Sequence, residues 1–205
     1  MPGGIGEQNG AETDFQRLEG DCRFRRLMSR PCIFFDRDGI VNESPGPGYV
    51  ERWADFHLQP GFVAALKVVT DKGYPAVIVT NQQGVAKGLY SEEELNGMHG
   101  NMRAELRSHG VDVLDVFQCI HFAADDCACR KPKPGMIFQA SETYDLDPSA
   151  SWMIGDSEKD VEAGQAAGCR TIRVCPKDEE TKAEFQVETM DEAAALLEKE
   201  LEPCV

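Results

Sequence analysis

The sequence predicts a single Rossmann-like α/β domain of three layers, with helices on both faces of a mostly parallel sheet. Short apolar runs alternate with segments of helical spacing from residue 31 onward, which is the pattern of repeated βαβ units. The chain has 205 residues, a length that suits one domain. Its 41% hydrophobic and 28% charged residues are the ordinary mix of a soluble fold with a core of normal size.

Buried strands are predicted where an apolar run is bounded by turn residues. In chain order these runs are Cys32–Phe35, Ala76–Thr80, Val116–Ile120, Trp152–Ile154 and Thr171–Val174. In parallel sheets of this kind, ligands bind beyond the carboxyl ends of the strands. The residues that follow each run are therefore the place to look for chemistry.

Helices are predicted between the strands from spacing and end signals. Pro and Gly precede the first helix, a capping-box pattern opens the second at Ser91, and Gly168 follows the fourth. The predicted helices are Phe62–Thr70, Ser91–Ser108, Gly135–Thr143, Lys159–Ala167 and Met190–Leu201. The acidic stretch from Asp178 to Glu188 is interpreted as a solvated turn and strand edge.

The two ends of the chain differ in character. Residues 1–30 hold glycine, glutamine and scattered charges, and we expect a disordered tail there, followed by the folded domain over 31–205. Four arginines late in this tail form a small basic patch, which we interpret as a solvated lead-in; they are Arg23, Arg25, Arg26 and Arg30.

Charge and hydropathy exclude several classes of function. Lys plus Arg is 21 and Asp plus Glu is 36, which gives a net charge of −15. A chain this acidic is a poor candidate for nonspecific binding to nucleic acid or to an anionic membrane. No apolar run approaches about 18 residues, and no secretory signal is evident. We therefore expect a cytoplasmic monomer whose partner is a small molecule.

The eight cysteines favour a metal site over a disulfide framework, since nothing in the sequence points to export. Cys119 and His121 are followed closely by Cys127 and Cys129. Three thiols and an imidazole in two close pairs suit tetrahedral Zn²⁺. Because the set holds no carboxylate and leaves no open position, we predict a structural zinc that fixes the loop preceding Arg130.

Polar residues follow the predicted strands in a consistent order. Asp36 and Asp38 follow the first strand, Thr80 ends the second, Lys131 follows the third, and Asp156 and Asp160 follow the fourth. Carboxylates of this kind gather a hard cation such as Mg²⁺, and an Asp can attack a phosphate to form an aspartyl-phosphate. A hydroxyl and an ammonium group can hold the phosphate oxygens. The set predicts phosphoryl transfer.

These motifs resemble those of the haloacid dehalogenase superfamily of aspartate-nucleophile phosphatases, over about residues 31–175. The resemblance implies that Asp36 is the nucleophile and Asp38 the general acid and base. It also implies that Asp36, the carbonyl of Asp38 and Asp156 bind Mg²⁺, with Asp160 as an outer-shell partner. The short intervals between the motifs leave no room for a cap domain, so we expect a capless phosphatase.

The cysteine loop narrows the resemblance to two families, the heptose 1,7-bisphosphate phosphatases and the histidinol-phosphate phosphatase domains. Three local matches favour the heptose enzymes, whereas the short spacer between His121 and Cys127 favours the histidinol-phosphate domains. The resemblance implies a phosphorylated sugar as substrate, with Arg130 on its second phosphate. The residues expected to contact the substrate are Gly48, Tyr49, Asn81, Gln82, Gln83 and Arg130.

Two features depart from the heptose enzymes. The Pro45–Gly48 stretch lengthens the loop after the first motif, and Ser157 stands where those enzymes often have a lysine. Both put the choice of sugar and anomer in doubt. The alternatives are another small phosphomonoester, such as histidinol phosphate, or a non-catalytic phosphate-binding module. The last requires a broken catalytic set, and the set here is complete.

Overall fold

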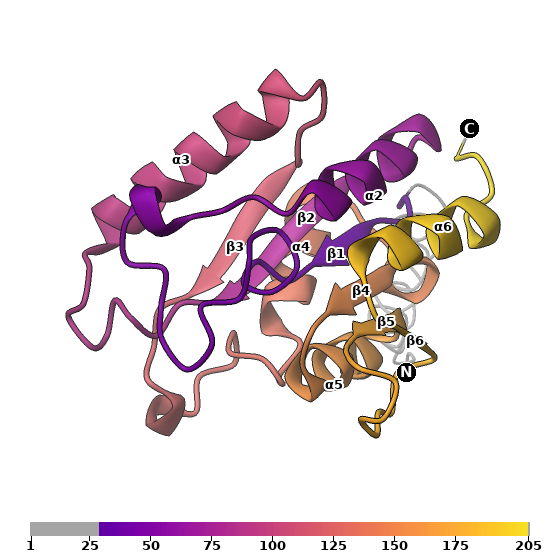
Figure 1. The fold of residues 1–205 in the computed structure, drawn as a ribbon. Helices are drawn as coiled ribbons and strands as arrows, with labels where there is room; N and C mark the ends of the chain where they lie inside the picture. The colour runs from indigo at the N-terminus through magenta and orange to yellow at the C-terminus, as the bar shows by residue number, and fades with distance from the viewer. Residues whose placement is uncertain (1–28, 205) are drawn as a thin grey trace, which may run out of the picture.

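The computed structural model describes residues 29–204, in which a six-stranded sheet lies between helices on both of its faces (Figure 1). The expected disordered tail over 1–30 lies outside the described residues except for Ser29 and Arg30. Arg30 is held in place, since its backbone forms a parallel bridge with Leu146. No helix of residues 29–204 is long and apolar enough to span a membrane.

All strands of the sheet run parallel, in the order β3-β2-β1-β4-β5-β6. Their bounds are Ile33–Phe35 (β1), Ala76–Asn81 (β2), Asp115–Cys119 (β3), Trp152–Gly155 (β4), Arg170–Val174 (β5) and Phe185–Val187 (β6). The chain builds outward from β1 in one direction and from β4 in the other. The pair β1 and β4 is thus the switch point, beyond whose carboxyl ends a ligand crevice is expected.

The predicted helices are confirmed, with ends shifted by a few residues. The α-helices are Pro60–Asp71 (α2), Glu92–Ser108 (α3), Gly135–Tyr144 (α4), Glu158–Ala167 (α5) and Met190–Glu200 (α6). Single 3-10 turns lie at Trp53–Asp55 (η1), Ala123–Asp125 (η2) and Pro148–Ala150 (η3). The capping box at the start of α3 has formed: the Ser91 hydroxyl accepts from the Glu94 amide, and the Glu94 carboxylate accepts from the Ser91 amide.

Strand β6 was not predicted as a strand. The interpretation of Asp178–Glu188 as a turn and strand edge captured its position but missed its pairing with β5. β6 has three residues, of which Gln186 is polar and only Val187 is buried. A segment this short gives no alternation that sequence patterns can detect.

The sheet separates two apolar cores, because alternate residues of a strand point to opposite faces. Ile33 and Phe35 pack with α2, α3 and α6 on one face, and Phe34 packs with α4 and α5 on the other. Figure 1 shows α2 and α6 side by side over their face. Burial on both faces explains why the central strands read as continuous apolar runs.

No cap domain interrupts the described part of the chain. Between β1 and β2 the structure holds a loop, η1 and α2. Isolated β-bridges of Asn42 with Asp38 and Leu58 fix the two ends of this loop. The carboxyl ends of β1 and β4 are consequently reached through loops alone.

Candidate active site

A pocket of about 230 Å³ lies at the carboxyl ends of β1, β2 and β4. It brings together every residue that the sequence predicted for catalysis and magnesium: Asp36, Asp38, Thr80, Lys131, Asp156 and Asp160. Of the residues expected to contact substrate, four line the pocket: Gly48, Tyr49, Asn81 and Arg130. Gln82 and Gln83 are not among the lining residues. The loops of four strands thus converge on one concave site.

Two glycines let the carboxylates approach one another. Gly39 has φ +88°, and a Cβ there would lie 2.2 Å from Asp156 Oδ2. A Cβ at Gly155 would lie 2.2 Å from the Cβ of Asp160 and 2.5 Å from its Oδ2. Any side chain at either position would push a carboxylate out of the site, so the close approach requires glycine.

Lys131 is the central cation of the pocket. Its Nζ lies 2.6 Å from Asp36 Oδ1 and 2.6 Å from Asp160 Oδ1, and it donates to the carbonyl of Val79 at 2.7 Å. Its side chain is only 4% exposed. Burial alone would lower the pKa of Lys131, but the two carboxylates outweigh burial and hold the pKa above its usual value. Lys131 is therefore a fixed ammonium ion.

The carboxylates are more negative together than one lysine can balance. Burial, followed by the charge of Asp160, raises the pKa of Asp36 to about 8, although Lys131 opposes the shift. The same two causes raise the pKa of Asp156 to about 6. Ligand oxygens of Asp36, Asp156 and Asp160 all lie within 4.8 Å of one another. A cluster of carboxylate oxygens whose negative charge exceeds the nearby positive charge fits a hard divalent cation.

Asp38 is fixed by donors on three sides. Arg37 Nη2 donates to both oxygens of Asp38 at 2.9 and 3.0 Å, and its Nε donates at 3.1 Å. Asn42 Nδ2 and Gln82 Nε2 donate at 3.0 and 2.9 Å. The side chain of Asp38 keeps 25% exposure toward the pocket. Its orientation toward a ligand is thereby set before a ligand binds.

The role of Arg37 was not predicted, although its motif was recognised. The side chain is fully buried, and its Nη1 lies 3.2 Å from His99 Nε2. Burial and the charge of Arg37 lower the pKa of His99 to about 3, so the imidazole is neutral and accepts the hydrogen bond. His99 is buried, and it is linked to Asp38 through Arg37. No local sequence signal marks the pairing of Arg37 with His99, since the two residues are 62 positions apart.

Gln82 was expected to contact the substrate, and the structure places it elsewhere. The side chain is fully buried. Besides Asp38, its Nε2 reaches Thr80 Oγ1 at 2.9 Å, and its Oε1 accepts from the hydroxyl of Tyr90 at 2.7 Å. All polar atoms of the Gln82 amide are thus engaged below the pocket. Its position fits a support for Asp38 and Thr80.

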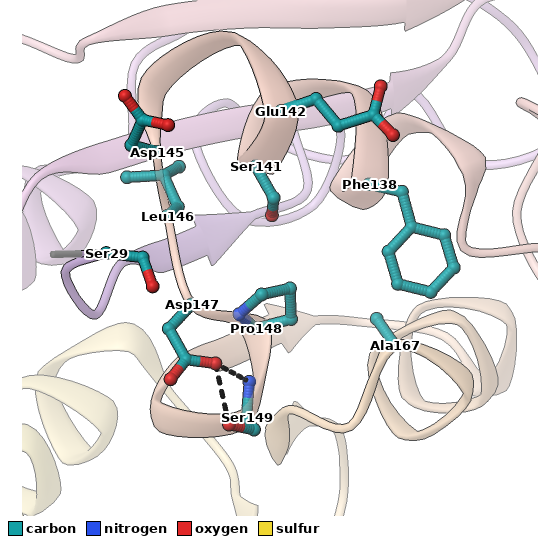
Figure 2. A pocket seen from close by; sticks show the side chains of 10 residues that line it. All are labelled: Ser29, Phe138, Ser141, Glu142, Asp145, Leu146, Asp147, Pro148, Ser149 and Ala167. Atoms are coloured by element: carbon teal, nitrogen blue, oxygen red, sulfur yellow. Dashed lines mark hydrogen bonds between the residues drawn. The ribbon is translucent and has the colours of Figure 1, made fainter. Parts of the chain in front are cut away.

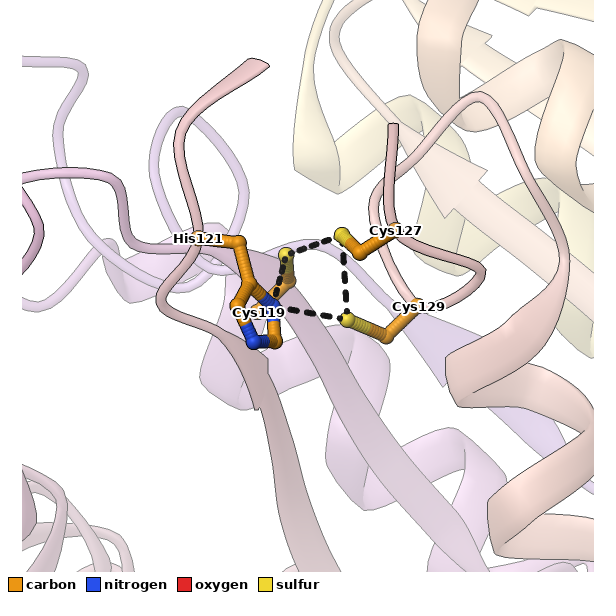
Figure 3. Close-up of side chains that lie close together, drawn as sticks. All are labelled: Cys119, His121, Cys127 and Cys129. Carbon is orange, nitrogen blue, oxygen red and sulfur yellow. Dashed lines mark hydrogen bonds between the residues drawn. The ribbon is translucent and has the colours of Figure 1, made fainter. Parts of the chain in front are cut away.

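The cysteine and histidine side chains of the 119–129 segment converge as predicted (Figure 3). The sulfur of Cys119 lies 3.6 Å from both His121 Nδ1 and Cys127 Sγ. Cys129 Sγ lies 3.2 Å from His121 Nδ1 and 3.4 Å from Cys127 Sγ. Bonds of about 2.0–2.3 Å to a tetrahedral zinc ion place ligand atoms roughly 3.3–3.8 Å apart. The four side chains fit such an ion.

The 119–129 segment is followed directly by Arg130 and Lys131, two residues of the pocket. The amide of Asn81 clamps the backbone of Lys131, donating to its carbonyl at 3.0 Å and accepting from its N–H at 3.1 Å. Arg130 Nη2 donates to Gln83 Oε1 at 3.0 Å, and its Nη1 donates to the carbonyl of His121 at 3.4 Å. Gln83 thus reaches the site through Arg130.

Comparison with known proteins identifies a family. The HAD-hydrolase-like family model matches residues 128–198. The D-glycero-alpha-D-manno-heptose-1,7-bisphosphate 7-phosphatase of Photorhabdus laumondii is 39% identical over 142 residues, which cover 66% of this chain and 76% of that protein. The D-glycero-beta-D-manno-heptose-1,7-bisphosphate 7-phosphatase of Pseudomonas aeruginosa is 35% identical, covering 72% and 82%.

A solved structure agrees with these sequence relatives. The D,D-heptose 1,7-bisphosphate phosphatase from B. bronchiseptica, crystallised with magnesium and phosphate, superposes with a TM-score of 0.75 and 31% identity. The match covers 83% of this chain and 99% of that one. At this identity and coverage, the solved structure supports the same family and fold.

Proposed function

The chain belongs to the HAD-like hydrolases and is a phosphatase, and from this premise we propose that it removes the C7 phosphate of a D-glycero-D-manno-heptose 1,7-bisphosphate. The observation that carries the proposal is the convergence of Asp36, Asp38 and Lys131 in one pocket whose rim holds Arg130. Three of these groups serve the reacting phosphate. Arg130 remains for a second one, as a bisphosphate requires.

Asp36 and Asp38 divide the reaction into two steps. A carboxylate oxygen of Asp36 attacks phosphorus, and the bond from phosphorus to the C7 oxygen breaks. Asp38 gives the leaving oxygen a proton. Asp38 then takes a proton from water, and the resulting hydroxide attacks phosphorus. Inorganic phosphate leaves and the Asp36 carboxylate is regenerated.

Thr80 and Lys131 complete the binding of the reacting phosphate. We assign the Thr80 hydroxyl and the Lys131 ammonium group, both from residues that line the pocket, to bind the non-bridging oxygens. Magnesium, which the carboxylates fit, would bind to Asp36, Asp156 and the carbonyl of Asp38 and neutralise the charge of the phosphate. Asp160 forms an ion pair with Lys131 and so helps to keep its ammonium group beside Asp36.

The zinc that the 119–129 segment fits would have a structural task. Cys129 directly precedes Arg130 and Lys131, so fixing the four ligands also fixes the start of the catalytic loop. The site contains no carboxylate ligand and lies outside the residues that line the pocket. We assign it no contact with the substrate.

Phosphate release by the purified full chain with Mg²⁺ tests the substrate. The α and β anomers of the heptose bisphosphate and histidinol phosphate are offered side by side. We expect kcat/KM for one anomer to exceed that for histidinol phosphate by at least about 100-fold, or roughly 2.7 kcal/mol of transition-state discrimination. ³¹P NMR of the product should show that the C1 phosphate is retained.

Two outcomes would change the proposal. A preference for histidinol phosphate would transfer the chain to the alternative substrate class with the mechanism intact. Absence of release from any phosphomonoester, with the wild-type fold retained, would favour the non-catalytic phosphate-binding module. Asp36→Asn serves as the matched negative control in every assay, because it preserves the size and shape of the side chain.

A further inference from the structure

A second hollow lies away from the catalytic pocket, between α4, the turn into β4 and the end of α5 (Figure 2). Its volume is about 470 Å³. Apolar side chains form much of its lining, and Phe138 leaves 43% of its surface exposed there. The hollow adjoins the amino end of β4, whereas the catalytic pocket lies at the carboxyl end of that strand. We call it the α4–α5 groove.

Three carboxylates surround the apolar lining of the groove: Glu142, Asp145 and Asp147. Within residues 29–204 none of them forms an ion pair. Asp147 accepts hydrogen bonds from the amide and hydroxyl of Ser149 and has no ion-pair partner among the described residues. An apolar hollow ringed by unpaired carboxylates fits a segment that is both apolar and cationic.

The chain itself enters the fold at this groove. The N–H of Arg30 donates to the carbonyl of Asp145 at 3.1 Å, and the N–H of Asp147 donates to the carbonyl of Arg30 at 2.9 Å. This bridge fixes residue 30 against the groove wall, and Ser29 is one of the lining residues. The described part of the chain therefore begins at the edge of the groove.

The residues that precede Ser29 in the sequence have the composition that the groove fits. The segment from Arg23 to Met28 reads Arg-Phe-Arg-Arg-Leu-Met, with three cationic and three apolar side chains and no acidic one. A tethered segment this close to its site has an effective concentration in the millimolar range, far above that of a separate partner at the same affinity. Proximity, charge and polarity thus point to the same occupant.

We propose that residues 23–28 dock into the α4–α5 groove of the same chain. Phe24 and Leu27 then cover the exposed ring of Phe138, while the arginines pair with the ring of carboxylates. This surface lies at the amino ends of the strands, so docking anchors the segment without contact with Asp36 or Lys131. The proposal is independent of the phosphatase substrate.

Trypsin supplies the test, because Arg23, Arg25 and Arg26 are cleavage sites and Arg17 is a reference in the same part of the sequence. The full chain is digested briefly and the cut sites are quantified by mass spectrometry. The groove variant Phe138→Ser/Glu142→Lys alters two exposed positions on α4. We expect cleavage after Arg25 and Arg26 to be at least tenfold faster in this variant than in the wild type, with the rate at Arg17 unchanged.

Two further variants keep the test decisive. Glu93→Lys makes the same charge change on α3, outside the groove, and should leave all cleavage rates at wild-type values. Phe24→Ser alters the segment instead of the groove and should accelerate cleavage as the groove variant does. Each variant should retain the wild-type circular dichroism spectrum and rate of phosphate release.

Equal cleavage rates at Arg25 and Arg26 in the wild type and in the groove variant would overturn the proposal. Protection that increases with protein concentration, together with dimers in sedimentation velocity, would also overturn it in favour of a second copy as the occupant. Addition of 1 M NaCl gives a further check, since screening of the ion pairs should increase cleavage in the wild type and have no effect in the groove variant.

Discussion

The carboxylate cluster of the pocket and the cysteine and histidine cluster of the 119–129 segment differ in what holds them. Asp36 and Asp160 are tied to Lys131, and Asp160 also accepts from the amide and hydroxyl of Ser157. The side chains of the cysteine cluster contact one another and the edge of an apolar core, and among them only Cys119 is buried.

The difference indicates which of the two clusters would need a bound ion to keep its side chains in place. The carboxylate cluster is assembled by strands, glycines and a buried lysine, so it should persist without metal. The cysteine cluster joins a strand end to an exposed loop through four side chains. We expect its geometry to depend on zinc, because the free energy of metal binding there would also stabilise the folded conformation of the loop.

Removal of the proposed nucleophile should have the largest effect on rate and little effect on the fold. Asp36→Asn keeps the shape of the side chain and an oxygen for Lys131 to contact. We expect kcat to fall by about 10⁴-fold or more, since the proposed mechanism assigns the covalent intermediate to Asp36 alone. The thermal unfolding midpoint should change by only a few degrees. A variant that retains one-tenth of the wild-type rate would contradict the assignment.

Removal of the lysine should damage both rate and stability. Lys131→Met leaves Asp36 and Asp160 buried without their cation, and uncompensated buried charges cost about 3–5 kcal/mol. We expect the free energy of unfolding, measured with urea in EDTA, to fall by about 3 kcal/mol. Lys133→Met, whose lysine pairs with Asp126 at an exposed site, is the matched control and should cost less than about 1 kcal/mol. Equal stability of the two variants would refute a cluster held by Lys131.

Loss of the proposed zinc ion should disturb one loop and spare the sheet. With Cys129→Ser, or after chelation, we expect kcat/KM to fall about tenfold, because Arg130 and Lys131 lose their anchor. Amide hydrogen exchange should accelerate over 119–130 and remain slow in β1 and β4. Cys175→Ser, a buried thiol outside the cluster, is the control. Full activity of protein shown to be zinc-free would limit the cluster to an incidental role.

The sequence predicted which polar residues gather in the pocket, because most of them lie at or just after the end of a strand. A parallel sheet brings such positions together whatever the details of packing. Asp36, Thr80 and Asp156 could therefore be placed before any side-chain contact was known. The cysteine cluster was equally accessible, since its ligands are close in the sequence and their types are specific to metal.

The supports of the site were missed because they depend on contacts between distant residues. His99 lies on α3, far along the chain from Arg37, and no local pattern links them. Gln82 was placed in the substrate site because its motif borders the pocket, yet its side chain points to Asp38 and Tyr90. Adjacent residues such as Asn81 and Gln82 thus face different environments, and this difference is visible only in the folded structure.

His99 offers a test of this hidden support through pH. Burial and Arg37 lower its pKa to about 3, while Asp38 and Gln118 oppose the shift. A histidine in the unfolded chain binds a proton near pH 6.5, so the folded state loses stability as pH falls below about 6.5. The loss should reach about 2 kcal/mol at pH 5. His99→Gln should flatten this part of the profile, and His109→Gln, at an exposed position, should leave it unchanged.

The smallest effect is expected at the junction between the two clusters. Gln83 holds one nitrogen of Arg130, while the carbonyl of His121 in the cysteine segment holds another. Gln83→Ala removes one hydrogen bond to a half-exposed cation, which is worth about 1 kcal/mol. If Arg130 binds the second phosphate, KM for the bisphosphate should rise about fivefold with kcat unchanged, and KM for a monophosphate should not move. Gln165→Ala, on α5, is the control. A fall in kcat with constant KM would mean that Gln83 acts on Lys131 and the reacting phosphate. The proposed division between Arg130, which binds the second phosphate, and Lys131, which serves the reaction, would then be wrong.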